Sequence, residues 1–439
     1  MILNVSGVSR IRAVLPILAA AVLVAIGNAQ TDPGPRGGPP AAGGPVAGLN
    51  NIPTLSAAFT AGSANFQETE DVPNNGLGPR FNSNSCVSCH SQPAVGGTSP
   101  ANNPQIQFAN SQNSVPSFIH PNGPAREARF IRKPDGSPDG GVHALFTIGG
   151  RSDQPSGCNL VQEDFSNASN IIFRIPTPTF GLGLIEAIQD STLVQNLASS
   201  GGAAFGIAGR LNRNGNDGTV TRFGWKAQNK SLLLFSGEAY NVEMGISNLL
   251  FNTERDETTN CSPLAPPNSI FNLGGKIDSA VFDDITAFAN FMRFLAPPAR
   301  GPIDNTVVQG SNQFFNVGCA RCHTVTLHTG ASPFPPLANQ EIHPYSDFAI
   351  HHMGPGLADQ ISQGAAGGDE FRTAPLWGLG QRLFFLHDGR ATDLVQVIHQ
   401  HASGANAQFP ASEANAVVTN FFHLSTSDQQ AVLNFLRSL

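Results

Sequence analysis

The apolar positions of residues 283–295 are spaced as in an amphipathic helix. Large apolar side chains recur there three or four positions apart, at Ile285, Phe288, Met292 and Leu295. An aspartate at the start of the segment suits the positive end of a helix, and Pro297 and Pro298 stop it. The pattern predicts a helix that ends before a short linker through Pro302.

Two further helices are expected after this linker. From Gly310, a helix that contains Phe314 and Phe315 leads towards Cys319. At the end of the chain, Ser427 is the expected N-cap of a last helix. The apolar face of this helix consists of Val432, Phe435, Leu436 and Leu439.

The N-terminal segment has the pattern of a secretory signal. Arg10 and Arg12 precede an apolar run over residues 13–26, and small residues follow at 27–29. An uncleaved membrane anchor is the alternative, but a membrane span needs about 20 apolar residues. We expect residues 1–29 to be removed, and the protein to be periplasmic or otherwise exported without a transmembrane segment. Residues 30–48, rich in Pro and Gly, are expected to form a flexible linker.

Composition excludes two broad classes of protein. The 439 residues include 30 Phe, and only 13% are charged, so a chain disordered throughout is excluded. The net charge is −7 and no basic run is present, which argues against nucleic acid as a partner. The high content of Gly (46) and Pro (33) predicts long loops around the helices.

Four of the six cysteines fall into two copies of one pattern. Each copy reads C-x-x-C-H, and the copies consist of Cys86, Cys89 and His90, and of Cys319, Cys322 and His323. This is the attachment signature of c-type haem, in which two thiols on one helical turn reach one porphyrin and the histidine ligates its iron. A redox pair needs no histidine, and a zinc site would bring the pairs close together in sequence. The sequence therefore predicts two covalently bound haems.

Cys158 and Cys261 remain outside these motifs. Disulfides persist in exported proteins, so we expect a bond between the two, with two separate buried thiols as the alternative.

The motifs divide the chain into two haem-binding halves. A cytochrome c domain consists of an opening helix, a C-x-x-C-H motif and a terminal amphipathic helix, in this order. Residues 303–439 have the same order. Residues 49–302 are expected to form a larger N-terminal haem domain with long loop and short-strand insertions. The predicted fold is mainly α, with two cytochrome c-like domains.

Several segments around these motifs resemble one family. They are Gly76–Asn82, Ser91–Gly97, Arg126–Phe130, Gly140–His143, Phe180–Ala187, Arg222–Ala227, Arg372–Leu379 and His387–Ala391. The chain resembles the di-haem oxidoreductases also called thiol oxidoreductases, which are relatives of bacterial di-haem cytochrome c peroxidase and of the di-haem enzyme that matures methylamine dehydrogenase. The resemblance covers nearly all of residues 55–439.

The resemblance also implies iron ligands. His90 and His323 are the expected proximal ligands. In the peroxidase relatives a methionine follows the histidine of His-Asp-Gly by fourteen residues, and here that position, counted from His387, is His401. We therefore expect His401 as the distal ligand of the second haem, with His399 and Met353 as rivals. For the first haem no distal ligand is singled out among the candidates Met244, His120 and His143.

A catalytic carboxylate and an electron relay are implied in the same way. Glu186 lies in an apolar stretch, and the related peroxidases place a carboxylate over the reactive haem, where burial raises its pKa and lets it move a proton. An ion pair to an arginine such as Arg174 is the alternative for Glu186. The relatives also place a tryptophan between the haems, so Trp225 and Trp377 are candidates for a relay or for simple packing.

These expectations lead to a periplasmic di-haem oxidoreductase of the peroxidase type. A small redox protein or another donor would supply electrons, and the protein would reduce peroxide or oxidise an unidentified organic substrate. The alternatives are a di-haem electron-transfer cytochrome without catalytic activity and an oxidase of thiols or of a partner protein. The relatives hold calcium between their domains, but no matching ligand cluster is visible in the sequence.

Overall fold

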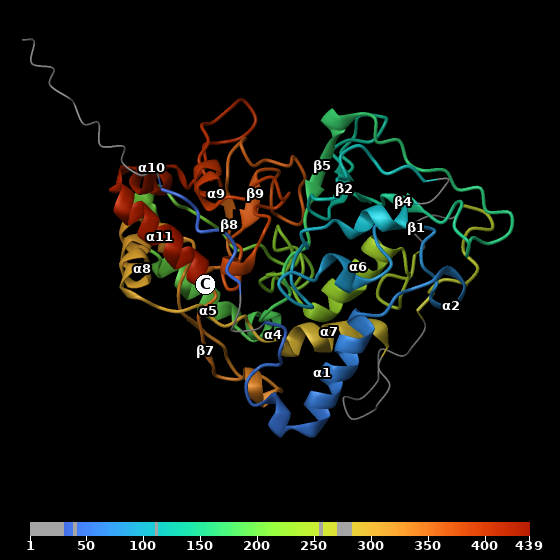
Figure 1. The fold of residues 1–439 in the computed structure, drawn as a ribbon, viewed down its shortest axis with the longest axis horizontal. Helices are drawn as coiled ribbons and strands as arrows, with labels where there is room; N and C mark the ends of the chain where they lie inside the picture. Colours follow the sequence, from blue (N-terminus) through green and yellow to red (C-terminus); the bar gives the residue numbers. More distant parts are fainter. Residues whose placement is uncertain (1–29, 38–41, 110–112, 254–257, 270–282) are drawn as a thin grey trace, which may run out of the picture.

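The computed structural model describes residues 30–37, 42–109, 113–253, 258–269 and 283–439. The predicted signal segment 1–29 lies outside these residues. Figure 1 shows the C-terminal helices on one side of the molecule and helices α1, α6 and α7 on the other. Every helix within the described ranges is too short or too polar to cross a membrane.

Regular structure in the described part is mainly helical, as expected, and the strands are only two to four residues long. The helices are α1 (Pro53–Phe66), α2 (Val72–Asn75), α3 (Cys86–Cys89), α4 (Leu182–Glu186), α5 (Asp190–Ser199), α6 (Leu232–Met244), α7 (Asp284–Phe294), α8 (Asn305–Val317), α9 (Leu394–Gln400), α10 (Asn415–His423) and α11 (Thr426–Ser438). The strands are β1 (Arg80–Phe81), β2 (Glu127–Phe130), β3 (Val142–His143), β4 (Phe146–Thr147), β5 (Ile171–Arg174), β6 (Leu327–His328), β7 (Glu341–Ile342), β8 (Ile350–His352) and β9 (Glu370–Arg372).

Helices α8 and α11 cross closely in the second half. A Cβ atom added to Gly310 would lie 1.9 Å from the carbonyl oxygen of Ala431, so only glycine permits this approach. The rings of Phe314 and Phe435 pack beside the crossing, with centroids 5.2 Å apart. All four residues of the predicted apolar face of the last helix are buried. This helix pair therefore frames the second C-x-x-C-H motif.

Helices α1 and α7 make a matching crossing in the first half. A Cβ atom on Gly62 would lie 2.3 Å from the carbonyl oxygen of Ala287, and the rings of Phe66 and Phe291 pack 4.8 Å apart. Asp283 caps α7 by accepting a hydrogen bond from the Thr286 N–H at 2.8 Å. Each half thus has an opening helix and a terminal helix that meet at a glycine.

Two predicted helix starts differ from the structure. Helix α8 begins at Asn305, ahead of Gly310, because the Asp304 carboxylate accepts a hydrogen bond from the Val307 N–H at 2.8 Å. The N-cap of α11 is Ser425 rather than Ser427, since the Ser425 hydroxyl accepts from the Asp428 N–H. In both cases an earlier polar side chain satisfies the first-turn N–H groups.

The short strands lie in small antiparallel sheets. In the first half the order is β3-β2-β5, which pairs Glu127 with Arg174 and Ala128 with His143. The other sheets pair β1 with β4, β6 with β7, and β8 with β9. The β3-β2-β5 sheet and the β8-β9 pair each contribute residues to the lining of one cavity, and the other two sheets contribute Phe81, Phe146, Leu327 and Ile342 to the largest apolar core.

A disulfide and a shared core hold the larger first half together. Cys158 and Cys261 are bonded, as the export prediction favoured. The largest apolar core belongs mainly to the first half, but it also contains Leu327, Phe348 and Trp377 from the second. The second core is built from α8, α10, α11 and the chain around Leu394. The halves therefore share packing across the predicted boundary.

The predicted flexible linker differs from what the structure contains. Residues 30–37 run beside α9 and α11 as a strap, in which the Asp32 carboxylate pairs with Arg437 at 2.6 Å (Figure 1). Further along, the Val46 N–H donates to the carbonyl of Phe294 at 2.8 Å, and Leu49 is fully buried. A buried ion pair holds residues 30–37, and a backbone hydrogen bond and apolar burial hold the chain at Val46 and Leu49, although composition favoured flexibility for 30–48; residues 38–41 lie outside the described residues.

Candidate haem sites

The first C-x-x-C-H motif forms one helical turn. Helix α3 spans Cys86–Cys89, and the backbone N–H of His90 donates to the carbonyl of Cys86 at 3.0 Å. Both thiols are free, and all three side chains line a cavity of about 410 Å³. We call this the first cavity.

The second motif repeats this arrangement. A 3₁₀ turn over Cys319–Arg321 carries the motif, and the His323 N–H donates to the carbonyl of Cys319 at 2.9 Å. Cys319, Cys322 and His323 line a second cavity of about 220 Å³. The two cysteine pairs therefore face separate cavities, as two porphyrin sites require.

Both motif histidines are oriented as metal ligands. The Nδ1 of His90 is 2.9 Å from the carbonyl oxygen of Gly97, and the Nδ1 of His323 is 2.9 Å from that of Tyr345. A proton on Nδ1 leaves the lone pair of Nε2 for iron. Burial lowers the pKa of each imidazole to about 4, so both are neutral, as ligation requires.

His401 has the same orientation in the second cavity. It follows the last residue of α9 and lines the cavity, and its Nδ1 is 2.7 Å from the carbonyl oxygen of Val397. Burial lowers its pKa. The rival His399 lies outside the lining and packs against Phe422, whereas Met353 does line the cavity.

Two buried arginines suit the second cavity to a haem. Arg372 donates to the carbonyl of Gly224 and Arg382 to that of Pro375, and no described carboxylate lies within ion-pair distance of either. Burial lowers the pKa of each guanidinium to about 10. Cations buried without counter-ions fit the carboxylates of haem propionates, because an unpaired buried charge is costly.

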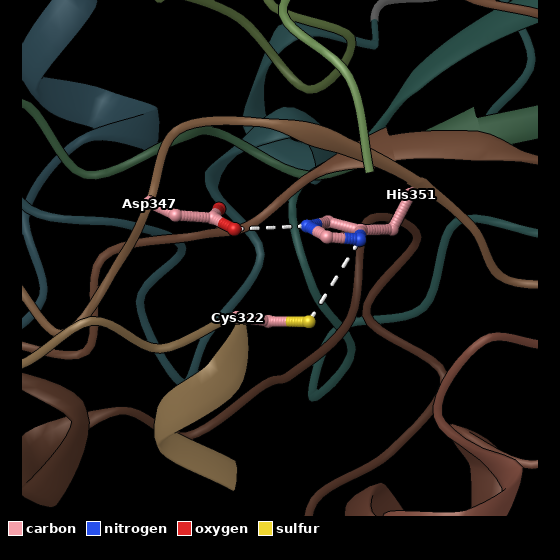
Figure 2. A group of neighbouring side chains, drawn as sticks. All are labelled: Cys322, Asp347 and His351. Atoms are coloured by element: carbon pink, nitrogen blue, oxygen red, sulfur yellow. Dashed lines mark hydrogen bonds and ion pairs between the residues drawn. The ribbon is translucent and has the colours of Figure 1, made fainter. Parts of the chain in front are cut away.

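A cluster beside Cys322 was not anticipated from the sequence. Figure 2 shows His351 between Asp347 and Cys322, with Nε2 3.0 Å from the Asp347 carboxylate and Nδ1 3.8 Å from the sulfur. Nδ1 also lies 2.7 Å from the carboxylate of Glu413. Burial opposes protonation, but Asp347 and Cys322 raise the pKa of His351 well above its usual value. With both nitrogens engaged by carboxylates, His351 is not arranged as an iron ligand.

This cluster also bears on calcium. Among the described residues, Cys322, Asp347 and His351 are the one group of three His, Cys, Asp or Glu ligand atoms close enough to share an ion. Calcium prefers oxygen ligands, and the C-x-x-C-H motif commits this cysteine to haem attachment. The set therefore does not fit calcium.

The first cavity is lined by charged groups. Glu127 and Arg129 of β2 project into it as an ion pair of 2.7 Å, and Glu238 and Glu243 reach it from α6. The carboxyl groups of Glu127 and Glu243 are hydrogen-bonded to each other. Such a bond needs one proton on the pair, because two ionised carboxylates are both acceptors.

The pKa values of two glutamates in this cavity are shifted in opposite directions. Burial opposes ionisation of Glu127, but Arg129 and the bond to Glu243 outweigh it and lower its pKa. Burial raises the pKa of Glu238. The cavity thus places a carboxyl group that Arg129 favours in its ionised form beside further carboxyl groups, which is an arrangement suited to proton transfer.

Polar atoms without protein partners point to a polar occupant. Arg174 Nε, Asn82 Nδ2 and Ser236 Oγ are buried, belong to residues that line this cavity, and find no partner among the described residues. Buried polar groups are normally hydrogen-bonded. Haem propionates, water or a polar substrate would satisfy them.

The first cavity contains no histidine besides His90 among its described lining residues. His120 is exposed, and both nitrogens of His143 are engaged, by Glu163 at 2.9 Å and Asp139 at 3.0 Å. The described thioethers in the lining are Met244 and Met292.

Glu186 lies outside the lining of both cavities. Its carboxylate pairs with Arg293 at 2.8 Å and accepts a hydrogen bond from the Leu232 N–H at 2.9 Å. The ion-pair alternative therefore has structural support, with Arg293 in place of Arg174. Arg174 instead pairs with the buried Asp359 at 2.7 Å.

Trp225 is the tryptophan that lines both cavities. Its indole N–H donates to the carbonyl of Ile175 at 3.0 Å, and its ring meets that of His387 edge-on at 6.5 Å. Trp377 is 7% exposed and belongs to the apolar core, where its ring packs against Gly181.

Sequence comparison supplies the class of this protein. Residues 142–439 match the family described as "Di-haem oxidoreductase, putative peroxidase". The match covers more than half of the chain, so the chain belongs to this di-haem oxidoreductase family. The first C-x-x-C-H motif precedes the matched residues. A comparison with curated proteins finds no match.

Three solved structures are similar over part or all of the chain. A MauG-like protein associated with microbial copper homeostasis is 17% identical, with a TM-score of 0.24, over 36% of this chain and 52% of that chain. The diheme peroxidase BthA from Burkholderia thailandensis E264 is 13% identical, with a TM-score of 0.29, over 65% and 91%. Hydrazine synthase of Kuenenia stuttgartiensis is 14% identical, with a TM-score of 0.34, over 99% and 100%. This chain therefore spans about half the length of the MauG-like protein.

Proposed function

We propose that the protein is an exported di-haem c-type oxidoreductase that reduces peroxide at the first cavity with electrons received through the second. Cys86 and Cys89 attach one haem and Cys319 and Cys322 the other, with His90 and His323 as proximal ligands. Each haem lies in its own cytochrome c-like domain, 49–302 and 303–439. The matching helix crossings at Gly62 and Gly310 support this division.

The contrast between the two cavities carries the proposal. The second cavity presents His401 as well as His323, which suits an iron with two fixed ligands and electron transfer. The first presents His90 and a proton-sharing carboxyl pair, but no second histidine among its described residues. This difference leaves the first iron site available to a small substrate.

The residues of the first cavity have separate tasks. A bound haem supplies one-electron chemistry and an iron position that peroxide can reach. Reduction of one hydrogen peroxide to two waters consumes two electrons, which the donor supplies through the second cavity, and two protons, which solvent supplies; the proton that Glu127 moves is one of peroxide's own. Ionised Glu127 accepts the first proton from peroxide, and the carboxyl pair with Glu243 returns it to the leaving oxygen. Arg129 keeps Glu127 ionised before the reaction.

Trp225 lies between the two cavities. Its side chain lines both, and the hydrogen bond to Ile175 fixes the indole between them. Trp225 is therefore the proposed electron relay, and Trp377 is a packing residue. A small redox protein in the periplasm is the proposed electron donor, because the chain is exported and its second site is an electron-transfer site.

An electron-transfer cytochrome is the second candidate. Met244 and Met292 line the first cavity, and a thioether bound to the first iron would leave no open position. Thiol oxidation has less support, because the cysteines outside the haem motifs are joined in a disulfide.

The test combines haem count, spin state and reaction. The full chain is expressed in a host with c-haem maturation, and its intact mass after acid-acetone treatment should include two haems. The ferric electron paramagnetic resonance spectrum should contain one low-spin and one high-spin haem. Stopped-flow mixing of the half-reduced protein with peroxide should oxidise the second haem. Two low-spin haems and no peroxide reaction would leave the electron carrier, and a mass without haem would overturn both.

A further inference from the structure

The strap of residues 30–37 has one strongly bound side chain. The Asp32 carboxylate accepts hydrogen bonds from Arg437 Nε at 2.7 Å, Arg437 Nη2 at 2.6 Å, the Leu394 N–H at 2.8 Å and the Gly34 N–H at 3.0 Å. The side chain is 4% exposed. A bidentate, buried carboxylate with four donors is a strong and directional contact.

Asp32 caps the helix that carries His401. Leu394 is the first residue of α9, and His401 follows its last residue. Helix α9 already has an N-cap, because Asp393 accepts from the Gln396 N–H at 3.0 Å. Asp32 satisfies a further first-turn N–H and adds a negative charge at the positive end of the helix. The strap therefore fixes the N-terminal end of α9, and His401 follows the C-terminal end of the same helix.

Arg437 extends the same contact into the wall of the second cavity. Its Nη1 donates to the carbonyl of Arg382 at 3.0 Å, and its guanidinium lies 5.2 Å from the ring centroid of Phe385. Arg382, Phe385 and Leu394 all line the second cavity. One carboxylate thus joins α9, α11 and the 382–385 segment.

We propose that Asp32 is a positioning residue for the second haem site and that the N-terminal strap completes the distal side of this site. The proposal rests on the proposed function, in which His401 ligates the second iron. Asp32 acts through α9 and touches neither ligand. The strap therefore sets how firmly His401 holds its position, and with it how accessible the second iron is to other ligands.

The test compares Asp32→Asn with wild type in the full haem-loaded protein. Asparagine keeps the volume, but it loses the charge and one acceptor oxygen, so the cap on α9 and the pair with Arg437 weaken. Outer contacts that orient metal ligands are commonly worth about 10–100-fold in affinity. We expect the second haem of Asp32→Asn to bind added imidazole at least about tenfold more tightly and to lose low-spin signal.

Two further variants separate positioning from general stability. Gln430→Ala removes the contacts of Thr31 with α11, together with one hydrogen bond to Asn434 within that helix, and should keep the wild-type spectrum. Asp32→Asn combined with Arg437→Gln removes the unpaired buried charge, so stability should recover in part, but the cap on α9 stays lost. The double variant should therefore retain the altered imidazole affinity.

The outcomes identify which idea fails. All spectra are recorded well below the melting temperature of each variant. If wild type lacks a low-spin second haem, the proposed function fails at that site. If wild type has it and Asp32→Asn retains both its low-spin signal and its imidazole affinity, the positioning role of Asp32 is overturned. Recovery of the wild-type spectrum in the double variant also overturns it, because a purely structural ion pair then explains the effect.

Discussion

In the first cavity, the side chains that share the lining with His90 include an ion pair and two further glutamates. In the second, the lining around His323 is mostly apolar, with His387 and His401 as further neutral imidazoles and two arginines that have no ion-pair partner among the described residues. The C-x-x-C-H geometry is nearly the same in both. The comparison teaches that nearly the same attachment motif can lie in different chemical surroundings, and in the proposed function these surroundings decide whether a proton or only an electron moves.

The largest effect is expected from a substitution in the first cavity, which tests whether its carboxyl groups distinguish it from the second. Glu127→Gln removes the carboxylate that accepts the proton while keeping its volume. A positioned proton-transfer group is worth about 10²–10⁴ in rate, so peroxide reduction should slow by that factor. Stopped-flow mixing measures the rate, and the ferric spectrum checks that the haem is retained.

Glu186→Gln is the matched control for this prediction. Glu186 pairs with Arg293 outside both cavities, so its change should lower the melting temperature and leave the peroxide rate nearly unchanged. The opposite result, with a slow Glu186→Gln and a normal Glu127→Gln, would return the catalytic role to Glu186 as the family resemblance implies.

The next effect concerns the second cavity. His401→Ala should convert the second haem from low spin to high spin and open it to small ligands, because the opposing imidazole is removed. Electron paramagnetic resonance measures the change. His399→Ala should leave the spectrum unchanged, since that ring packs on Phe422. An unchanged low-spin signal in His401→Ala would shift the assignment to Met353, which Met353→Leu would then test.

A third prediction concerns the stability of the two halves. The disulfide between Cys158 and Cys261 closes a loop with a sequence separation of 103. Loss of a native disulfide costs about 2–5 kcal/mol, so replacing both cysteines by serine should lower the unfolding free energy by that amount. The loss should concern the first half. Denaturant unfolding followed separately by the spectrum of each haem should show the surroundings of the first haem unfolding at a lower denaturant concentration than in wild type, and equal shifts at both haems would mean that the halves unfold together.

Local patterns predicted α7, α8 and α11 and the two attachment motifs. The C-x-x-C-H motifs form within five consecutive residues, and α7 is set by its own spacing and its Asp283 cap, so neither needs distant information. The prediction of two cytochrome c-like domains did not extend to a match between the two helix crossings. The glycine contacts that make it, such as Gly310 against Ala431, depend on two helices and appear only in the structure.

The residues proposed here to move protons could not be found from the sequence, because they meet only in three dimensions. Glu127 comes from β2 and Glu243 from α6, and nothing local links them. The sequence did offer one signal. Glu127 and Arg129 lie two residues apart, so in a strand their oppositely charged side chains lie on the same face. For Glu186 the local pattern was misleading. Its apolar neighbours are buried, which suggested a buried catalytic carboxylate, but its own side chain forms an ion pair with Arg293.

The strap was missed for a related reason. Proline and glycine content predicts flexibility when nothing else is known, and the partner of Asp32 is Arg437, at the far end of the chain. A buried pair over such a separation leaves no local pattern. Compositional predictions are therefore weakest where a few polar contacts, instead of an apolar face, order a segment.

The smallest expected effect is a pH dependence specific to the first half. Glu70 is 3% exposed, and its charge contributes to the raised pKa of the Cys86 thiol. Burial, with Glu68 and Asp284 nearby, raises its pKa from 4.5 to about 8. Between these values the folded chain holds a proton that the unfolded chain releases, so this group makes stability fall as pH rises. Glu70→Gln removes that penalty.

The variant should therefore gain stability at pH 8 and almost none at pH 4, where Glu70 is protonated in both states. A one-unit shift in pKa corresponds to about 1.4 kcal/mol, so the gain at pH 8 should exceed about 1 kcal/mol. Urea unfolding at both pH values measures it. Glu341→Gln, at an exposed position in the second half, is the control and should change stability little at either pH. A gain of equal size at pH 4 would show that the carboxyl is destabilising through packing and not through its proton, and the buried acid beside Cys86 would then no longer distinguish the first half from the second.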